Sequence, residues 1–423
     1  MFSEASLHGI SIRVMHDEER RTPSQVRGSP LVIEGHAGVS FETLGRFLDD
    51  HSDDVLKSIT QHGAVLLRDF PIRTPSDFEN TCLRMRGLEG IREVFMSEPG
   101  RTLVEGTRHV LHTNTLYKTG GSLSPFAFHT ENFYVPDVPR YISFFCRKSS
   151  WLGGETGLID MTALYAELSE TVREALCKRS YLVARIPATR IQQRYSLTEE
   201  EFLALFDTDD FTIEKAEDSW NLLLYKPCVL VHPETGLPSL QVNLAGELNS
   251  RGLERKALWE FRHDFAGPQW LAHRLCWQYP AISWLVGVLS APIEATKRAL
   301  RTRGRARVAS TTPPAVRVGE CFLPPDIEHL AKLMRRHYVS FRWRAGDVLL
   351  VDNLRMAHAG MPGLGDRDLN AIICNRVALP CHVNAPGCFT VPDDTTPSFG
   401  SILISRNHAT DGSNTGAMAS DSH

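Results

Sequence analysis

The sequence lacks the features that mark several classes of protein. Its nine cysteines include no Cys-x-x-Cys pair, which argues against a structural zinc site and a disulfide framework. No stretch of 18 uninterrupted apolar residues occurs, and residues 1–21 hold no apolar run of signal-peptide length. We therefore expect neither a membrane-spanning helix nor a secretory leader. A cytoplasmic location, where thiols stay reduced, is the prediction that follows.

An excess of charge of one sign is also missing. The chain has 46 basic and 50 acidic residues and a formal net charge of -4, which gives no general attraction to nucleic acid or to an anionic membrane. Residues 301–307 are rich in arginine, but a solvated loop is a better interpretation of them than a docking patch. We expect no nucleic-acid or membrane partner, and the sequence leaves the oligomeric state open.

The chain does contain two short fragments with metal-ligating side chains. The first is His129-x-Glu131, and the second ends at His358 and is followed by Arg367 nine residues later. Residues i and i+2 of a β-strand point to the same face, so a strand over residues 125–134 would place His129 and Glu131 side by side. Two imidazoles and one carboxylate are the donor set typical of a mononuclear non-haem Fe(II) centre with open positions for further ligands.

The His-x-Asp/Glu triplet by itself is not specific, because the chain contains four of them. His16 lies in a charged stretch near the N-terminus, and His51 lies in a helical pattern, where residues i and i+2 diverge. His232 precedes a Pro-Glu-Thr-Gly turn. We therefore favour His129-x-Glu131 as the ligand pair, with ordinary strand residues as the alternative.

The residues around this pair extend the pattern. An apolar strand at residues 141–146 precedes Gly153-Gly154-Glu155-Thr156, and further on come His232-Pro233-Glu234-Thr235-Gly236, Gly346-Asp347, and Asp352-Asn353 through His358 to Arg367. In this order the motifs resemble those of the taurine dioxygenase (TauD/TfdA-like) superfamily, within the clavaminate synthase-like group. The resemblance spans roughly residues 40–380. The chain departs from the family at Gly360, where arginine is common, and in the unusual length between the two histidines.

The resemblance implies a mainly β protein with flanking helices, built on a double-stranded β-helix (jelly-roll). It also implies that His129, Glu131 and His358 bind Fe(II), while Thr156 and Arg367 hold the distal carboxylate of the cosubstrate 2-oxoglutarate. Dioxygen is the third reactant. Arg376, in the same predicted strand as Arg367, is the alternative partner for the cosubstrate.

The expected reaction is hydroxylation, because halogenating relatives replace the carboxylate that Glu131 supplies. The residues of these motifs resemble those of the branch of the family that acts on amino acids or carrier-bound aminoacyl groups in secondary metabolism. Candidate substrate-facing residues are Asn114, Asn132 and Tyr134. Desaturation or epoxidation by the same iron is an alternative outcome. A jelly-roll hydrolase or isomerase using Zn or Mn, or a binding protein that only senses a small acid, are rivals that would not need oxidation.

Length and motif positions predict one enlarged catalytic domain. The ligand fragments lie so far apart that a single fold over residues 41–390 must contain both, with an N-terminal extension at residues 1–40. A helical insertion is expected at about residues 244–337, and residues 391–423 are expected to be partly disordered. Part of the insertion is predicted to close over the open end of the barrel, with Trp259, Trp277 and Trp284 dividing between packing and the pocket.

Overall fold

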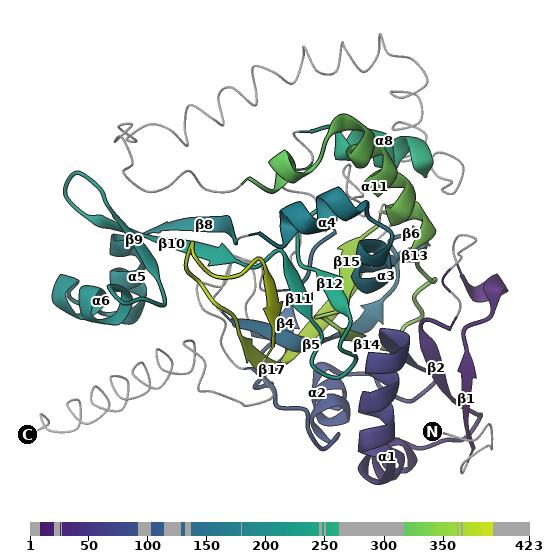
Figure 1. Ribbon diagram of the computed structural model, residues 1–423. Coiled ribbons are helices and arrows are strands. Elements are labelled where there is room, and N and C mark those ends of the chain that lie inside the picture. Colours follow the sequence, from purple (N-terminus) through teal and green to yellow (C-terminus); the bar gives the residue numbers. More distant parts are fainter. Residues whose placement is uncertain are drawn as a thin grey trace, which may run out of the picture.

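The computed structural model describes residues 9–20, 26, 28–91, 103–113, 128–131, 137–178, 180–244, 248, 251–261, 317–361, 363–364 and 367–391. The described part of the chain is mostly β-structure with flanking helices (Figure 1). The strands are β1 Ile10–Val14, β2 Leu31–Gly35, β3 Ala64–Arg68, β4 Leu111–His112, β5 Asp137–Lys148, β6 Leu152–Gly153, β7 Thr156–Asp160, β8 Tyr181–Pro187, β9 Thr212–Lys215, β10 Trp220–Lys226, β11 Val229–Val231, β12 Pro238–Leu240, β13 Tyr338–Val339, β14 Val348–Asp352, β15 Met356–Gly360, β16 Gly363–Leu364, β17 Asp368–Ala378 and β18 Cys388–Thr390. The helices are η1 Asp17–Glu19, α1 Phe41–His62, α2 Pro75–Leu83, α3 Met161–Ala166, α4 Glu170–Leu176, α5 Ala188–Tyr195, α6 Glu199–Phe206, α8 Leu253–Glu260, η2 Val318–Cys321 and α11 Pro324–Arg336.

The central element is a seven-stranded sheet with the order β1-β2-β3-β14-β5-β17-β4. Its pairs are antiparallel except β2 with β3. Alternate residues of the middle strands enter two different apolar clusters: on β14, Val348 and Leu350 face one cluster, and Leu349 and Val351 face the other. Both faces of the sheet are therefore covered at its middle, which explains why β3 and β14 each have four consecutive apolar residues rather than an alternating pattern.

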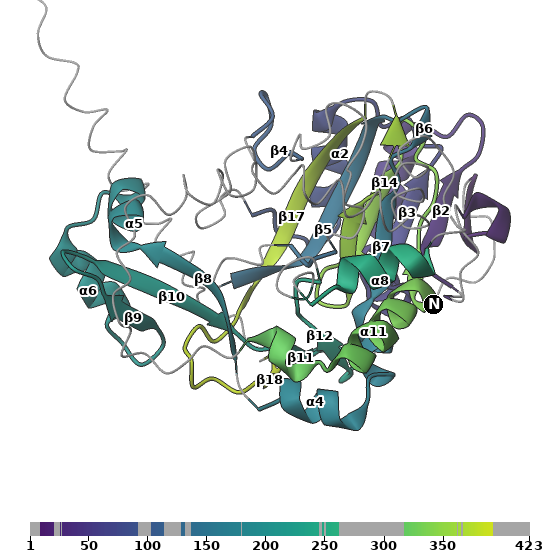
Figure 2. The ribbon, with the colours of Figure 1, turned by 90° about the horizontal axis from the view of Figure 1, so that it is seen from above.

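Helices α1 and α2 cover one face of the central sheet, and a smaller sheet with the order β13-β7-β15 lies against the other face. Helices α3, α8 and α11 pack on the far side of the smaller sheet. Figure 1 shows α1 and α2 on one side and α8 and α11 on the other, and Figure 2 shows α2 across the sheets from α8 and α11. The described helices of residues 244–337 therefore belong to the outer layer.

Local sequence signals explain where several elements begin and end. Ser40 caps α1 through its side-chain oxygen, and the helix ends at Gly63, whose φ of 76° suits glycine. Thr74 and Thr198 form capping boxes for α2 and α6. Helix α3 ends at Ala166, and the side chain of Ser169 then caps a separate helix, α4.

Residues 181–226 form an arm that extends away from the layered body in both views (Figures 1 and 2). The arm contains the sheet β8-β10-β9 and helices α5 and α6. It has an apolar cluster of its own, which includes Ile191, Phe202, Phe206 and Leu222. No described helix is long and apolar enough to cross a membrane.

Candidate metal centre

The two fragments that the sequence predicted as ligands meet at a single β-bridge. The N–H of His358, on β15, donates to the carbonyl of His129 at 2.9 Å, and the N–H of His129 donates back at 3.2 Å. Their imidazole ring centres are 4.7 Å apart. One reciprocal backbone contact thus brings together side chains that are 229 positions apart in the sequence.

Glu131 completes a compact group with these two histidines. One ligand atom from each of His129, Glu131 and His358 can be chosen so that all three lie within 4.8 Å of one another. Glu131 is 3% exposed and His358 is 6% exposed. Nε2 of His358 lies 3.6 Å from Oε2 of Glu131, which is too far for a hydrogen bond.

The donors suit the metal that the sequence predicted. Two imidazole nitrogens and a carboxylate oxygen are the set that non-haem Fe(II) takes in proteins, with positions left for exogenous ligands. A metal ion shared by Glu131 and His358 would bind Nε2 of His358, because this is the ring atom that lies 3.6 Å from the Glu131 carboxylate. The Glu131 carboxylate is buried, and a bound cation would offset the cost of burying its charge.

The strand expected at residues 125–134 differs from what the structure describes. Of these residues only 128–131 are described; His129 forms an isolated bridge and Glu131 lies in a turn. Strand periodicity therefore does not by itself orient Glu131 beside His129. Instead, the backbone N–H of Glu131 donates to Oδ1 of Asn353 at 2.6 Å, so a residue distant in the sequence holds the main chain at Glu131.

Asn353 is a functional candidate that side-chain type alone did not single out. Its Nδ2 donates to the carbonyl of Pro139 at 2.7 Å, and its own N–H donates to the carbonyl of Arg140 at 2.8 Å. The amide thus joins the start of β5 to the segment that carries Glu131. The Asp352-Asn353 motif was the available signal, but its contacts depend on the fold.

The group faces the apolar space between the central sheet and the smaller sheet. The ring of Phe144, on β5, meets the ring of His358 edge-on at 5.1 Å. Leu158, the residue of β7 that pairs with His358, is fully buried in the same cluster as Phe144. A largely apolar surround limits water at the metal and strengthens electrostatic contacts there.

Thr156 lies on β7, on the same face of the strand as Leu158, and it pairs with Gly360, which is two residue pairs beyond His358. It is 3% exposed, and its hydroxyl oxygen accepts a hydrogen bond from Nε1 of Trp343 at 3.2 Å. A hydroxyl that accepts in this way keeps its own hydrogen for another acceptor. Trp343 was missed, although Phe341-x-Trp343 has the two-residue spacing of a strand face.

Arg367 lies just before β17 and close to the same end of the smaller sheet. Its Cδ would be 3.5 Å from a Cβ placed on Gly154, which shows that the side chain lies over the Gly153-Gly154 segment. Burial raises the pKa of the neighbouring Cys146 thiol to about 12, and the Arg367 charge acts in the opposite direction. The structure therefore brings Arg367 and Thr156 to one end of the site.

Arg376 lies at the other end of β17. It pairs in register with Pro139, whereas Leu369, near Arg367, pairs with Cys146. Nη1 of Arg376 is 3.5 Å from Oδ2 of Asp137, so this guanidinium already faces a carboxylate. The structure does not bring Arg376 to the end of the site that holds Thr156.

Other predicted residues lie outside the described residues. These are Asn114, Asn132 and Tyr134, together with Trp277 and Trp284 of the predicted lid. Trp259 is described: it lies on α8 and its side chain is 47% exposed.

Comparisons with known proteins match most of the chain. A family model described as "Taurine catabolism dioxygenase TauD, TfdA family" matches residues 25–371. The dapdiamide synthesis protein DdaC of Enterobacter agglomerans is 21% identical over 355 residues, which cover 83% of this chain and 93% of that protein. A taurine dioxygenase structure from Burkholderia xenovorans is 15% identical, with a TM-score of 0.46 and coverage of 94% of this chain and 99% of that chain. PvcB, an Fe, alpha-ketoglutarate dependent oxygenase from an isonitrile synthetic pathway, is 13% identical, with a TM-score of 0.41 and coverage of 90% and 98%.

Proposed function

The chain belongs to the TauD, TfdA family of Fe(II)- and 2-oxoglutarate-dependent dioxygenases, and we propose that it hydroxylates an unactivated C–H bond of a small molecule. The buried group of His129, Glu131 and His358 is the observation that carries this proposal. A Zn or Mn hydrolase or isomerase would not need Thr156 and Arg367 at one end of the site, and a protein that only senses a small acid would not consume oxygen.

We propose that these three side chains hold Fe(II) inside a double-stranded β-helix. The central sheet and the sheet β13-β7-β15 would be the two halves of that barrel, because the ligand group lies between them. Strands β1 and β2, from residues 1–40, extend the central sheet, so the catalytic domain would include them.

Bound Fe(II) and 2-oxoglutarate together use dioxygen to hydroxylate a C–H bond, with release of succinate and CO2. The residues of the chain have the tasks of binding, orientation and exclusion of water. Glu131 would supply the third protein ligand of the metal, which would favour hydroxylation over halogenation. Phe144 and Leu158 present apolar surface beside His358 and would keep water from the reacting atoms. Desaturation or epoxidation at the same centre is the alternative outcome.

The distal carboxylate of 2-oxoglutarate would be held by Arg367 and Thr156. The guanidinium supplies a charge-assisted contact, and the Thr156 hydroxyl donates because Trp343 already occupies one of its acceptor positions. Arg376 is the weaker candidate for this role, since it lies at the opposite end of β17 beside Asp137.

We propose an amino acid or a carrier-bound aminoacyl group of secondary metabolism as the substrate, acted on in the cytoplasm. A relative that spans most of this chain is named for dapdiamide synthesis, which supports a small-molecule biosynthetic role. Asn114, Asn132 and Tyr134 remain the candidate substrate contacts. Residues 253–300 remain the proposed lid, and the structure describes residues 253–261 of them, which include helix α8.

One experiment separates this function from its rivals. Fe(II) and 2-oxoglutarate are added to the protein without oxygen, and the weak visible charge-transfer band of the complex is recorded. Air is then admitted with candidate aminoacyl substrates, and succinate is measured. We expect the band and substrate-dependent succinate in the wild type, and neither in Glu131→Ala. A wild-type protein that binds Fe(II) but gives neither signal would exclude the proposed oxygenase.

A further inference from the structure

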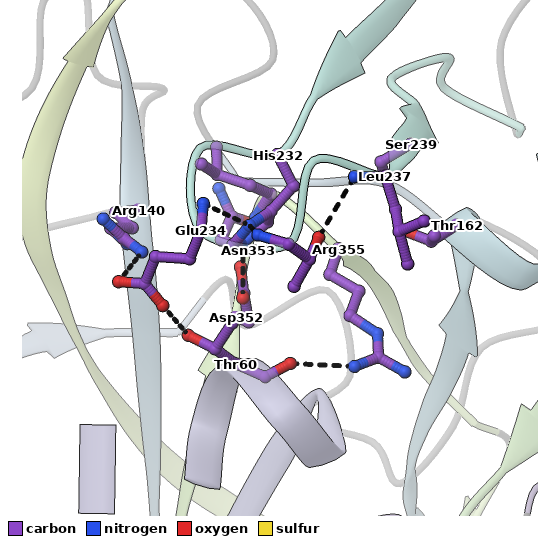
Figure 3. A network of polar contacts seen from close by, with 12 residues as sticks. Thr60, Arg140, Thr162, His232, Glu234, Leu237, Ser239, Asp352, Asn353 and Arg355 are labelled. Atoms are coloured by element: carbon purple, nitrogen blue, oxygen red, sulfur yellow. Dashed lines mark hydrogen bonds and ion pairs between the residues drawn. The ribbon is translucent and has the colours of Figure 1, made fainter. Parts of the chain in front are cut away.

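The hairpin β11–β12 docks on the turn that precedes the metal-binding strand β15. This turn, residues 352–355, is called the ligand turn here. His232, at the end of β11, is 1% exposed, and its Nε2 lies 2.8 Å from Oδ2 of Asp352, which is fully buried. Figure 3 shows this contact within a wider polar network between the hairpin, the ligand turn and the end of α1. Neither His232 nor Asp352 contributes a ligand to the metal group.

The hydrogen bonds around His232 fix its tautomer. Its Nδ1 lies 3.2 Å from the backbone N of Glu234 and 3.3 Å from that of Thr235. Both of these groups are donors, so Nδ1 must be the acceptor and the ring hydrogen must be on Nε2. Nε2–H therefore donates to the Asp352 carboxylate. His232 thus accepts hydrogen bonds within its own hairpin and donates one hydrogen bond to the ligand turn.

Asp352 links His232 to the residues that hold Glu131 at the metal site. Its Oδ1 accepts from the N–H of Leu354 at 3.1 Å, so the two carboxylate oxygens are engaged by the turn and by His232. The next residue, Asn353, accepts the N–H of Glu131. Rotation of Asp352 would tilt the ligand turn and with it the amide that holds Glu131. The connected path is His232, Asp352, Asn353 and Glu131.

We propose that His232 is a positioning residue whose Nε2–H, through Asp352 and Asn353, fixes the orientation of Glu131 at the metal centre. This inference rests on the proposed function only in taking Glu131 as a metal ligand. Mutation of a group that orients a metal ligand typically weakens metal binding by about 10- to 100-fold.

The hairpin has other anchors that should keep it docked when the His232 contact is lost. Glu234 forms an ion pair with Arg140, and the Thr60 hydroxyl donates to Glu234 at 2.6 Å. Arg355, in the ligand turn, binds Asp160 and the carbonyl of Thr60. Variants at His232 are therefore expected to fold, and these anchors supply controls.

Substitution can separate the hydrogen bonds that His232 makes within the hairpin from the one that it donates to Asp352. In His232→Asn the amide oxygen occupies the position of Nδ1 and can still accept from the hairpin, but nothing reaches Asp352. In His232→Gln the amide nitrogen occupies the position of Nε2 and can still donate to Asp352, but the hairpin loses its acceptor. A role through Asp352 predicts that Asn is damaging and Gln is tolerated, whereas a purely local role in the hairpin predicts the reverse.

The first readout is Co(II) affinity, followed by the visible bands of the bound ion in the full-length protein. We expect His232→Asn to weaken Co(II) binding by about tenfold or more and His232→Gln to stay within about threefold of the wild type. The matched control is Glu234→Gln, which weakens the hairpin's ion pair with Arg140 and leaves the His232 to Asp352 contact in place. It should bind Co(II) as the wild type does.

The second readout needs no metal. Hydrogen exchange in the peptide containing Glu131 should be faster in metal-free His232→Asn than in the wild type or His232→Gln. Asp352→Asn gives an independent check if His232→Asn does not fold. The carboxylate accepts from Leu354 and His232 through different oxygens, whereas an amide has one acceptor oxygen, so this variant should also show faster exchange at Glu131. Equal exchange and affinity in His232→Asn and the wild type would overturn the proposal. A wild-type protein that does not bind Co(II) would instead refute the proposed metal centre, and the exchange result would still stand.

Discussion

The carboxylate of Glu131 is buried beside two imidazoles, an arrangement that is costly for the charged group without a cation. We expect His129→Ala, Glu131→Ala and His358→Ala each to weaken Co(II) or Fe(II) binding by more than about 100-fold, beyond the loss typical of a supporting partner. The circular dichroism spectrum should be retained. The measurement is metal titration, with exposed His36→Ala as the control. Full iron occupancy and hydroxylation in Glu131→Ala would show that the assignment is wrong.

Arg367 and Thr156 make a graded prediction for cosubstrate binding. Arg367→Ala should raise the 2-oxoglutarate concentration for half-saturation by about 10- to 100-fold, because a charge-assisted contact contributes roughly 1.5–3 kcal/mol. Thr156→Val removes one neutral hydroxyl and should cost less. Arg376→Ala is the matched control, since its guanidinium faces Asp137 at the far end of β17. A larger effect from Arg376→Ala would reverse the two assignments.

At the scale of elements, the layered body and the arm of residues 181–226 have separate apolar clusters. The three metal-group residues are outside the arm's cluster, whose members include Phe202 and Phe206. Damage to the arm should therefore leave the metal centre largely intact. The pairing of β7 with β15, by contrast, sets the positions of Thr156 and His358 together.

This separation predicts the effect of a cavity in the arm. Phe206→Ala should destabilise the arm by about 3–5 kcal/mol, because Phe206 is fully buried. Limited proteolysis should then cut within residues 181–226 sooner than in the wild type, while Co(II) affinity stays the same. Phe145→Ala, in the core between the central sheet and α2, is the comparison that should unfold the body as well. Loss of metal binding in Phe206→Ala would show that arm and body fold as one unit.

At the scale of the whole molecule, buried charges connect segments that are distant in the chain. Nη2 of Arg68, on β3, lies 2.7 Å from Oδ2 of Asp347, and Nη1 of the same side chain is 3.1 Å from Oε1 of Glu19. These contacts join the N-terminal strands to the entrance of β14. Lys226 is another buried charge-bearing residue, at the end of β10 where the arm meets the body.

Lys226 predicts a pH dependence of stability. Burial lowers the pKa of its amino group from 10.5 to about 7, against the opposing effects of Cys381 and Asp137. Between these pH values the unfolded chain binds a proton that the folded chain does not, so the free energy of unfolding should rise with pH from about 7 to 10.5. Below pH 7 the burial of the charged Lys226 amino group lowers the free energy of unfolding by its full amount.

Lys226→Met should raise the free energy of unfolding at pH 7 by about 1–4 kcal/mol and flatten its rise with pH. Denaturant titrations at several pH values measure both effects. Lys332→Met, on the exposed side of α11, should leave the slope unchanged. A less stable Lys226→Met protein with an unchanged slope would mean that the folded protein keeps this amino group charged and well paired.

Much of the site could be predicted from the sequence because ligand chemistry is a property of residue type. The sequence predicted His129, Glu131 and His358 as one group, and the structure brings these three side chains together. The sequence also predicted Thr156 and Arg367 as partners of the cosubstrate, which stays a prediction. Local elements were also predictable where a short-range signal exists, as with the Ser40 and Thr198 caps and the β11–β12 hairpin. Such signals act within a few residues and need no knowledge of the fold.

The tertiary structure decided which distant groups support those donors. Asn353 accepts from Glu131, Trp343 donates to Thr156, and His232 donates to Asp352 across separations of 120 to 222 residues. Each contact depends on strand register and on how two layers pack, so a shift of one residue would turn the side chain to the other face. Residue types alone predict which groups would bind the metal and which metal they favour, whereas the packing of the two sheets determines what holds these groups in place.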